Sequence, residues 1–183
     1  GRREIVEDRR EEDRAADDVG PDGKRAEPRE RQVARREHLR QEQHAERLDQ
    51  ELDNLRGALE WGEQEPGEEA AEILLRLSAA LWRFWEMRWH VEEGRRWLSA
   101  ALARSEHVSP SLRATVLNAA GNLARDQGDH DQAEAYHEQC LAIRRSLGDT
   151  RGIATSLNNL GVVARDLGDA ERTLELCGEA CSL

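Results

Sequence analysis

Four side chains in the second half of the chain have types and spacing that could bind a metal ion. They are His137 and Cys140, followed by Cys177 and Cys181. Imidazole nitrogen and thiolate sulfur are the ligands of structural zinc sites, and four of them complete such a site. Cysteine also behaves as a small apolar residue in protein interiors, and the sequence contains no Cys-x-x-Cys pair. We expect packing roles here and no cofactor, with a zinc-binding module as an alternative.

The many carboxylates are a second candidate for chemistry. Asp and Glu number 38 against 27 Lys and Arg, so the formal net charge is -11. Catalysis would need a nucleophile with a base, or paired carboxylates in a cleft. Here the acidic residues alternate with arginines at helical spacing, which is typical of solvent-exposed helix faces. We therefore predict that the protein is not an enzyme. The acidic balance also argues against direct contact with nucleic acid, because phosphate backbones attract clustered cations.

A stripe of amide and guanidinium groups could bind a peptide. Asn118, Asn122 and Arg125 are spaced i, i+4 and i+7, and Asn158 and Arg165 repeat two of these positions later in the chain. An Asn side chain can pair with both the N–H and the C=O of an extended backbone. The forked guanidinium of Arg suits a carboxylate. We predict a peptide- or partner-binding groove at these five residues, and the alternative is a solvated face without a ligand.

The stripe lies within a stretch that the chain repeats. Residues 114–141 and 154–181 share the pattern AT-x-LN-x-x-G-x-x-ARD-x-GD at an offset of 40 residues. A fixed period of this length is typical of stacked two-helix units, each too small to bury its own apolar face. The Gly-Asp pair that closes the pattern predicts the end of one helix and the cap of the next.

Each copy also places a glycine inside its first helix, at Gly121 and Gly161. A glycine at such a position costs about 1 kcal/mol relative to alanine. Close approach of the partner helix would explain why glycine stands there.

The two copies resemble a tetratricopeptide repeat. The first helix carries Leu117-x-x-Ala120-Gly121-x-x-Ala124, and the second carries Ala133-x-x-x-His137. The period is 40 residues instead of the usual 34, and His137 and Cys177 stand where an aromatic is usual. The resemblance implies an all-α fold, a right-handed superhelix of helical hairpins with about seven helices. It also implies that first helices line a concave groove, which would contain the stripe of Asn and Arg.

The chain before these copies divides into two parts. Residues 1–38 combine few apolar side chains with dense charge, so we expect disorder or a lone helix there. Residues 39–183 form the predicted helical repeat domain, with clear repeats at 114–153 and 154–183 and a degenerate repeat at about 70–106. Residues 72–89 are apolar around most of a helical circumference, which places that helix at the centre of the core.

Three tryptophans in that central helix could form an aromatic cage. Trp82, Trp85 and Trp89 are spaced i, i+3 and i+7. Burial of such rings is favourable through their area alone, without a ligand. We therefore expect all three in the core.

A second, narrower resemblance covers the degenerate part. The segments DNLRGALEW (53–61), ALWRFW (80–85) and EGRRWL (93–98) look like the start of helical-repeat arrays in bacterial NB-ARC/STAND-type signal-transduction ATPases. Trp89 stands where that pattern usually has a turn glycine. The resemblance implies a non-catalytic protein-interaction or sensor segment of a larger bacterial signalling or transcriptional regulator. A free-standing assembly scaffold is the alternative.

The remaining expectations concern location and assembly. No apolar run approaches the roughly 20 residues of a membrane span, and no secretory segment is present. Three cysteines without framework spacing indicate reduced thiols, so we predict a cytoplasmic protein that does not enter membranes. The pattern stops inside a helix at Leu183, as in a fragment, and leaves apolar residues uncovered. We therefore predict self-association through this end, or its coverage by further repeats; the residues involved are Leu174, Cys177, Ala180 and Cys181.

Overall fold

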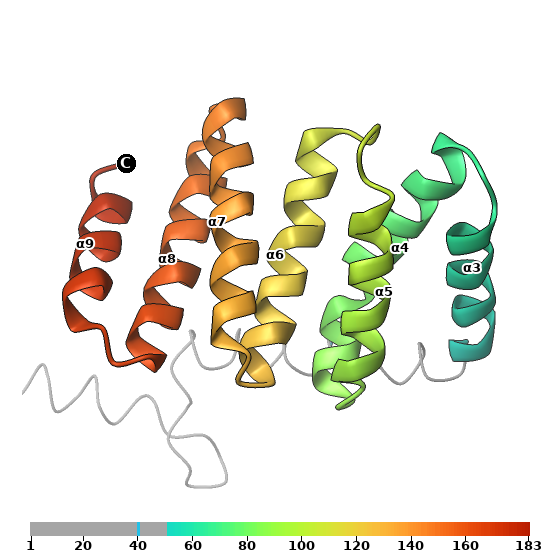
Figure 1. Ribbon diagram of the computed structural model, residues 1–183, viewed down its shortest axis with the longest axis horizontal. Coiled ribbons are helices and arrows are strands. Elements are labelled where there is room, and N and C mark those ends of the chain that lie inside the picture. The colour runs from blue at the N-terminus through green and yellow to red at the C-terminus, as the bar shows by residue number, and fades with distance from the viewer. Residues whose placement is uncertain (1–39, 41–50) are drawn as a thin grey trace, which may run out of the picture. The chain divides into compact units, whose positions relative to one another are not determined.

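Seven α-helices and no strands make up residues 51–183 in the computed structural model, which describes these residues and residue 40 (Figure 1). The all-α helical-repeat prediction is confirmed for this part of the chain. The predicted extension 1–38 and the boundary at residue 39 lie outside the described residues. The helices are α3 (Leu52–Gln64), α4 (Glu68–Met87), α5 (Val91–Ala103), α6 (Pro110–Asp126), α7 (His130–Leu147), α8 (Thr150–Asp166) and α9 (Ala170–Cys181).

The ends of these helices follow the Gly-Asp pairs seen in the sequence. Gly128 and Gly168 have φ values of 78° and 80°, a region that an L side chain rarely enters. The next residue in each case caps the following helix: the Asp129 carboxylate accepts from the Gln132 N–H, and the Asp169 carboxylate from the Arg172 N–H at 3.0 Å. Local sequence therefore fixes where the α6–α7 and α8–α9 hairpins turn.

The helices pack as consecutive antiparallel hairpins, α4 with α5, α6 with α7, and α8 with α9 (Figure 1). The backbone of α6 also approaches the backbones of α4 and α8, whereas the backbones of α5, α7 and α9 do not approach one another. The helices α4, α6 and α8 are thus more closely spaced than α5, α7 and α9, and this difference curves the array. We call the α4, α6 and α8 side the inner face.

The close approach that the sequence predicted at both mid-helix glycines is found at Gly121 and not at Gly161. A Cβ atom added at Gly121 would lie 2.6 Å from Cε1 of His137, so any side chain there would overlap the imidazole. At Gly161 the added atom would lie 3.6 Å from the Cys177 sulfur, an ordinary contact. The smaller side chain on α9 thus leaves room that the imidazole on α7 does not.

Buried residues extend from α3 to α8, and α6 contributes more of them than α4, the helix predicted at the centre of the core. The fully buried side chains include Leu74, Leu75 and Trp85 on α4, with Trp97 and Leu98 on α5. None of the residues of α9 is buried, so the core ends at α8. No helix in the described residues is long and apolar enough to span a membrane.

The prediction that Trp89 lies in the core is wrong. Its side chain is 89% exposed, whereas Trp85 is 1% exposed and Trp82 is partly buried. The helix that carries Trp85 ends at Met87, two residues before Trp89. The i, i+7 relation therefore no longer places Trp89 on the buried face.

An arginine joins the first described hairpin to α3. The Arg104 guanidinium, at the end of α5, donates to four backbone carbonyls at the end of α3 and in the turn that follows. The acceptors are Gly62, Glu63 at 2.8 Å, Glu65 at 2.7 Å and Gly67 at 3.2 Å. This side chain satisfies carbonyls that a helix C-terminus leaves without intrahelical partners.

Candidate partner-binding surface

An amide pair links the first helices of the two clear repeats. Nδ2 of Asn159 on α8 donates to Oδ1 of Asn118 on α6 at 3.0 Å. The repeat pattern predicted Asn158 for this surface, because Asn158 aligns with Asn118, and it did not predict Asn159. The counterpart of Asn159 in the earlier copy is Ala119, so the repeat pattern does not indicate a role for Asn159. Helix periodicity alone could not show which of two adjacent asparagines faces α6.

The three predicted asparagines differ in what they can offer a ligand. Asn118 is partly buried and already paired, Asn122 is only 9% exposed, and Asn158 is exposed. Asn158 is therefore the most accessible of the three amides. The three asparagines lie on α6 and α8, neighbouring helices of the inner face. They differ in how accessible they are to a ligand.

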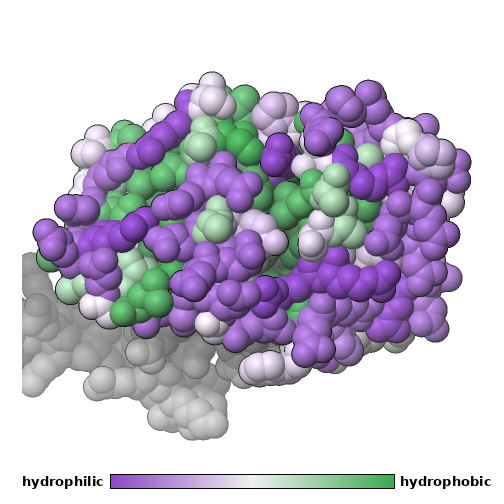
Figure 2. All heavy atoms as spheres, viewed as in Figure 1, coloured by the Kyte–Doolittle hydropathy of each residue, from purple (hydrophilic) through white to green (hydrophobic). Residues whose placement is uncertain are grey.

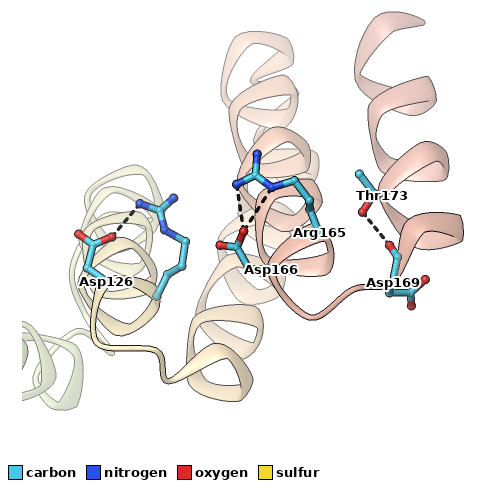
Figure 3. Close-up of polar contacts among 6 residues, drawn as sticks. Asp126, Arg165, Asp166, Asp169 and Thr173 are labelled. Carbon is cyan, nitrogen blue, oxygen red and sulfur yellow. Dashed lines mark hydrogen bonds and ion pairs between the residues drawn. The ribbon is translucent and has the colours of Figure 1, made fainter.

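Both predicted arginines form ion pairs with the residue that follows them. Arg125 donates to the Asp126 carboxylate at 2.8 Å, and Arg165 donates to the Asp166 carboxylate at 2.9 Å (Figure 3). Both pairs lie in the last turn of a first helix, so they repeat from α6 to α8. The Arg165 side chain is 66% exposed and the Arg125 side chain 26% exposed. A ligand carboxylate reaching either guanidinium would share it with an aspartate.

The four candidate metal ligands divide between the interior and the surface. His137 and Cys140 are fully buried on α7, whereas Cys177 and Cys181 are exposed on α9. Within residues 51–183, no three His, Cys, Asp or Glu side chains form a group that could hold a metal ion. The structure therefore offers no ligand set for the zinc alternative.

Burial dominates the chemistry of His137. Its ring covers Gly121, and neither ring nitrogen has a hydrogen-bond partner among the described residues. Burial lowers the pKa of this imidazole to about 4, and the positive charges of Arg125 and Arg144 lower it further in the same direction. The ring is therefore neutral at neutral pH and acts as an apolar packing group.

A buried polar chain joins α6, α7 and α8. The Cys140 thiol donates to the Ala114 carbonyl at 3.2 Å, and the Ser156 hydroxyl donates to the Cys140 sulfur at 3.4 Å. Arg144 donates to that same hydroxyl at 3.0 Å and to the Gly152 carbonyl at 2.9 Å. Burial raises the pKa of the Cys140 thiol. Cys140 thus serves the contact between repeats as a protonated donor.

A hollow of about 450 Å³ lies among α7, α8 and α9. Its apolar lining comes from Leu141, Leu157, Leu160 and Leu176. Ion pairs join α7 to α9 at its rim: Arg145 with Glu179, and Arg172 with both Glu134 and Glu138. Figure 2 shows hydrophobic residues on this part of the viewed face, crossed by hydrophilic ones.

A second hollow, of about 780 Å³, lies beside the turn between α4 and α5. Its lining includes the exposed Trp89 and several carboxylates, and Asp126 of α6 closes one side. Burial raises the pKa of Glu86, and the neighbouring carboxylate of Asp126 raises it further. Two acidic groups therefore share a small space beside a solvent-exposed indole ring.

Comparison with known proteins gives a consistent result for the fold. A family model described as tetratricopeptide repeat matches residues 91–146 and 112–182. Curated protein sequences gave no match.

Two solved structures are similar to this chain. The TPR domain of Arabidopsis FLU has 18% sequence identity and a TM-score of 0.56, covering 61% of this chain and 95% of that one. BtubC from P. vanneervenii has 21% identity and a TM-score of 0.60, covering 78% of this chain and 56% of that one. The chain thus spans little more than half of the BtubC structure, and at these identities the likeness concerns the fold.

Proposed function

Because this chain belongs to the tetratricopeptide repeat family, whose fold generally serves protein–protein interaction, we propose that it binds an extended segment of a partner protein on its inner face. The residues proposed to contact that segment are Asn118, Asn122, Arg125, Asn158 and Arg165. The observation that carries this proposal is the position of α6 and α8: their backbones approach each other, so polar groups of consecutive repeats lie along one surface.

The accessible groups on this surface suit a peptide backbone. Asn158 can both donate to a backbone carbonyl and accept from a backbone N–H. The amide pair of Asn118 and Asn159 fixes the spacing between α6 and α8, which keeps the surface preorganised. We expect affinity with little sequence preference from these amides.

The arginines are proposed to add selectivity. Arg165 is the more exposed, and it can extend its pairing from Asp166 to an acidic side chain or a carboxylate of the partner. Each Arg-Asp pair is formally neutral, so attraction would be local, and the net charge of the protein opposes long-range steering of an acidic ligand.

Site-directed photo-crosslinking tests this surface. A photoreactive amino acid at position 158 should crosslink a partner that the same residue at position 139, on the exposed side of α7, does not. The double variant Asn158→Ala, Arg165→Gln should then bind the purified partner with at least tenfold lower affinity in calorimetry, and its helicity should be unchanged. Equal crosslinking at both positions, or unchanged affinity of the variant, would exclude the inner face.

We further propose that this interaction module serves a bacterial signalling or transcriptional regulator in the cytoplasm. The support is the likeness of residues 53–61, 80–85 and 93–98 to the repeat arrays of such regulators. The alternative is a free-standing assembly scaffold. Reading the gene on either side separates the two, because an upstream phosphate-binding loop in the same frame favours the regulator.

Self-association through α9 is a third proposal. This helix has no buried residue, and its Leu174 side chain is 74% exposed. Repeat arrays bury such a face against a following unit, and a second copy of the chain could provide one.

A further inference from the structure

The turn between α4 and α5 has the same backbone geometry as the later turns but a different residue. In the later turns, Gly128 donates to the Arg125 carbonyl at 2.8 Å, and Gly168 donates to the Arg165 carbonyl at 2.9 Å. In the first turn, Trp89 donates to the Glu86 carbonyl at 3.4 Å. Trp89 therefore occupies the position that glycine occupies in both later repeats.

The backbone of Trp89 is strained at this position. Its φ is 60°, and within the described residues it alone has a positive φ without being a glycine. A bulky L side chain in this region is strained, at a cost that glycine avoids. His90, which follows it, provides no side-chain cap for α5, whereas the aspartates of the later turns cap their helices. The backbone therefore gives no reason for a tryptophan here.

Packing gives no reason either. The indole is 89% exposed, so it buries almost no apolar area, unlike Trp85 and Trp97 in the core. Large exposed aromatic rings beside a concavity are typical of binding surfaces. The exposed ring is therefore accessible to a partner molecule.

The concavity beside the ring is acidic. The hollow of about 780 Å³ is lined by Glu86, Trp89, His90, Val91, Glu92, Glu93, Asp126 and Gln127. Glu93 and Asp126 already have cationic partners, since Arg56 binds Glu93 through two hydrogen bonds of 2.7 and 2.8 Å and Arg125 pairs with Asp126. Even so, burial raises the pKa of Glu86 and the nearby carboxylate of Asp126 raises it further, and the positive charges of Arg83 and Arg125 offset only part of the total rise.

The charge at the Glu86 position is the reverse of that in the later repeats. By the turn hydrogen bonds, Glu86 corresponds to Arg125 and Arg165. The degenerate repeat therefore combines two departures at one place, an exposed aromatic in place of glycine and a carboxylate in place of a guanidinium. Both changes favour a cation over an anion.

We infer that this hollow is a binding site for an arginine or lysine side chain of a basic segment in a partner protein. The cation lies against the face of Trp89 and between the carboxylates of Glu86 and Asp126. An indole attracts a guanidinium or ammonium through its ring quadrupole, and carboxylates add charge-assisted hydrogen bonds. The net charge of -11 steers a basic segment toward the protein. None of the five inner-face residues lines this hollow, although Arg125 pairs with Asp126 at its edge. Variants at residues 158 and 165, one repeat away, therefore separate failure of this site from failure of the proposed function.

Calorimetry with acetylated, amidated hexa-arginine tests the inference on the full chain at physiological salt. Trp89→Gly restores the residue of the later turns, so it should weaken binding at least tenfold while leaving the melting temperature unchanged or raised. Glu86→Gln should weaken binding three- to tenfold. Trp61→Phe and Glu60→Gln, which alter an exposed tryptophan and an exposed carboxylate on α3, should change affinity less than twofold. Asn158→Ala with Arg165→Gln should leave hexa-arginine binding unchanged, whatever happens to the inner-face partner.

A direct readout comes from 5-fluorotryptophan labelling. The chain has five tryptophans, and the ¹⁹F resonance lost in Trp89→Gly identifies Trp89. Hexa-arginine should shift that resonance alone, and hexa-glutamate should shift none. If Trp89→Gly binds like the parent, or weakens no more than Glu60→Gln, general attraction to an acidic surface explains the binding and the site is wrong. Should Trp89→Gly unfold, Trp89→Asn serves instead, because asparagine tolerates this backbone region.

Discussion

The imidazole of His137 packs directly on the backbone of Gly121, with Cε1 2.6 Å from where a Cβ would stand. Gly121→Ala should therefore destabilise the protein by up to about 2 kcal/mol, because overpacking costs about 1–3 kcal/mol and the higher helix propensity of alanine offsets about 1 kcal/mol of this. Urea unfolding followed by circular dichroism measures the difference. Gly161→Ala is the matched control, and it should be neutral or stabilising since the nearest atom lies 3.6 Å away. Equal effects of the two changes would contradict the steric account.

The same imidazole should make stability depend on pH. Its pKa is about 4 in the folded protein against 6.5 for an unperturbed His, so the unfolded state binds the proton more readily. The neutral ring's contribution is present above about pH 6.5 and is lost as pH falls toward 4. Between pH 7 and pH 5 this loss is about 2 kcal/mol. His137→Phe should remove that part of the pH dependence. If the free energy of unfolding differs as much between pH 7 and pH 5 in the variant as in the parent, His137 is not its source.

Arg104 should matter far more than an ordinary surface arginine. Its guanidinium donates to four carbonyls around the end of α3, so Arg104→Ala leaves several of them without a protein partner. We expect a loss of about 2–3 kcal/mol, since hydrogen bonds that involve a charged group each contribute about 1.5–3 kcal/mol and water replaces some of them. Arg76→Ala, which removes an exposed i,i+4 pair with Glu72, should cost less than about 0.5 kcal/mol. Thermal unfolding measures the melting temperatures of both variants. Similar values would show that Arg104 does not stabilise the packing of α3.

The open side of α9 should control association. Leu174→Glu places a charge on the exposed face, so it should shift the protein toward monomer if copies meet there. Leu147→Glu, at an exposed leucine of α7, is the control and should not change the mass. Light scattering at increasing concentration reads out both. A parent protein that stays monomeric at every concentration would rule out self-association through this end.

The turns and the mid-helix glycines could be predicted from the sequence because their causes are local. Gly128 and Asp129 act on backbone groups within a few residues, so their meaning does not depend on the rest of the fold. Gly121 could be interpreted because a glycine inside a helix needs a neighbour to explain it. The helical repeat itself followed from the offset between the two copies.

What could not be predicted depends on orientation in three dimensions. Asn159 contacts Asn118 because of how α8 is rotated against α6, and the alignment of copies pointed to Asn158 instead. The exposure of Trp89 depends on the end of α4 at Met87, which hydrophobic spacing does not show. The sequence did show that Trp89 stands where a turn glycine is usual. That departure indicated an unusual turn, but it did not indicate that the indole ring is exposed.

The two rows of helices also differ in what resists bending. Along α4, α6 and α8 the backbones approach one another, whereas α7 and α9 are joined across a wider gap by long side chains, Arg145 to Glu179 and Arg172 to Glu138. Ion pairs between exposed groups weaken as salt screens them, while apolar contact does not. We therefore expect the outer side between α7 and α9 to loosen at high ionic strength, where these ion pairs are screened. The last hairpin, α8 with α9, would then be the part of the array whose position depends most on salt.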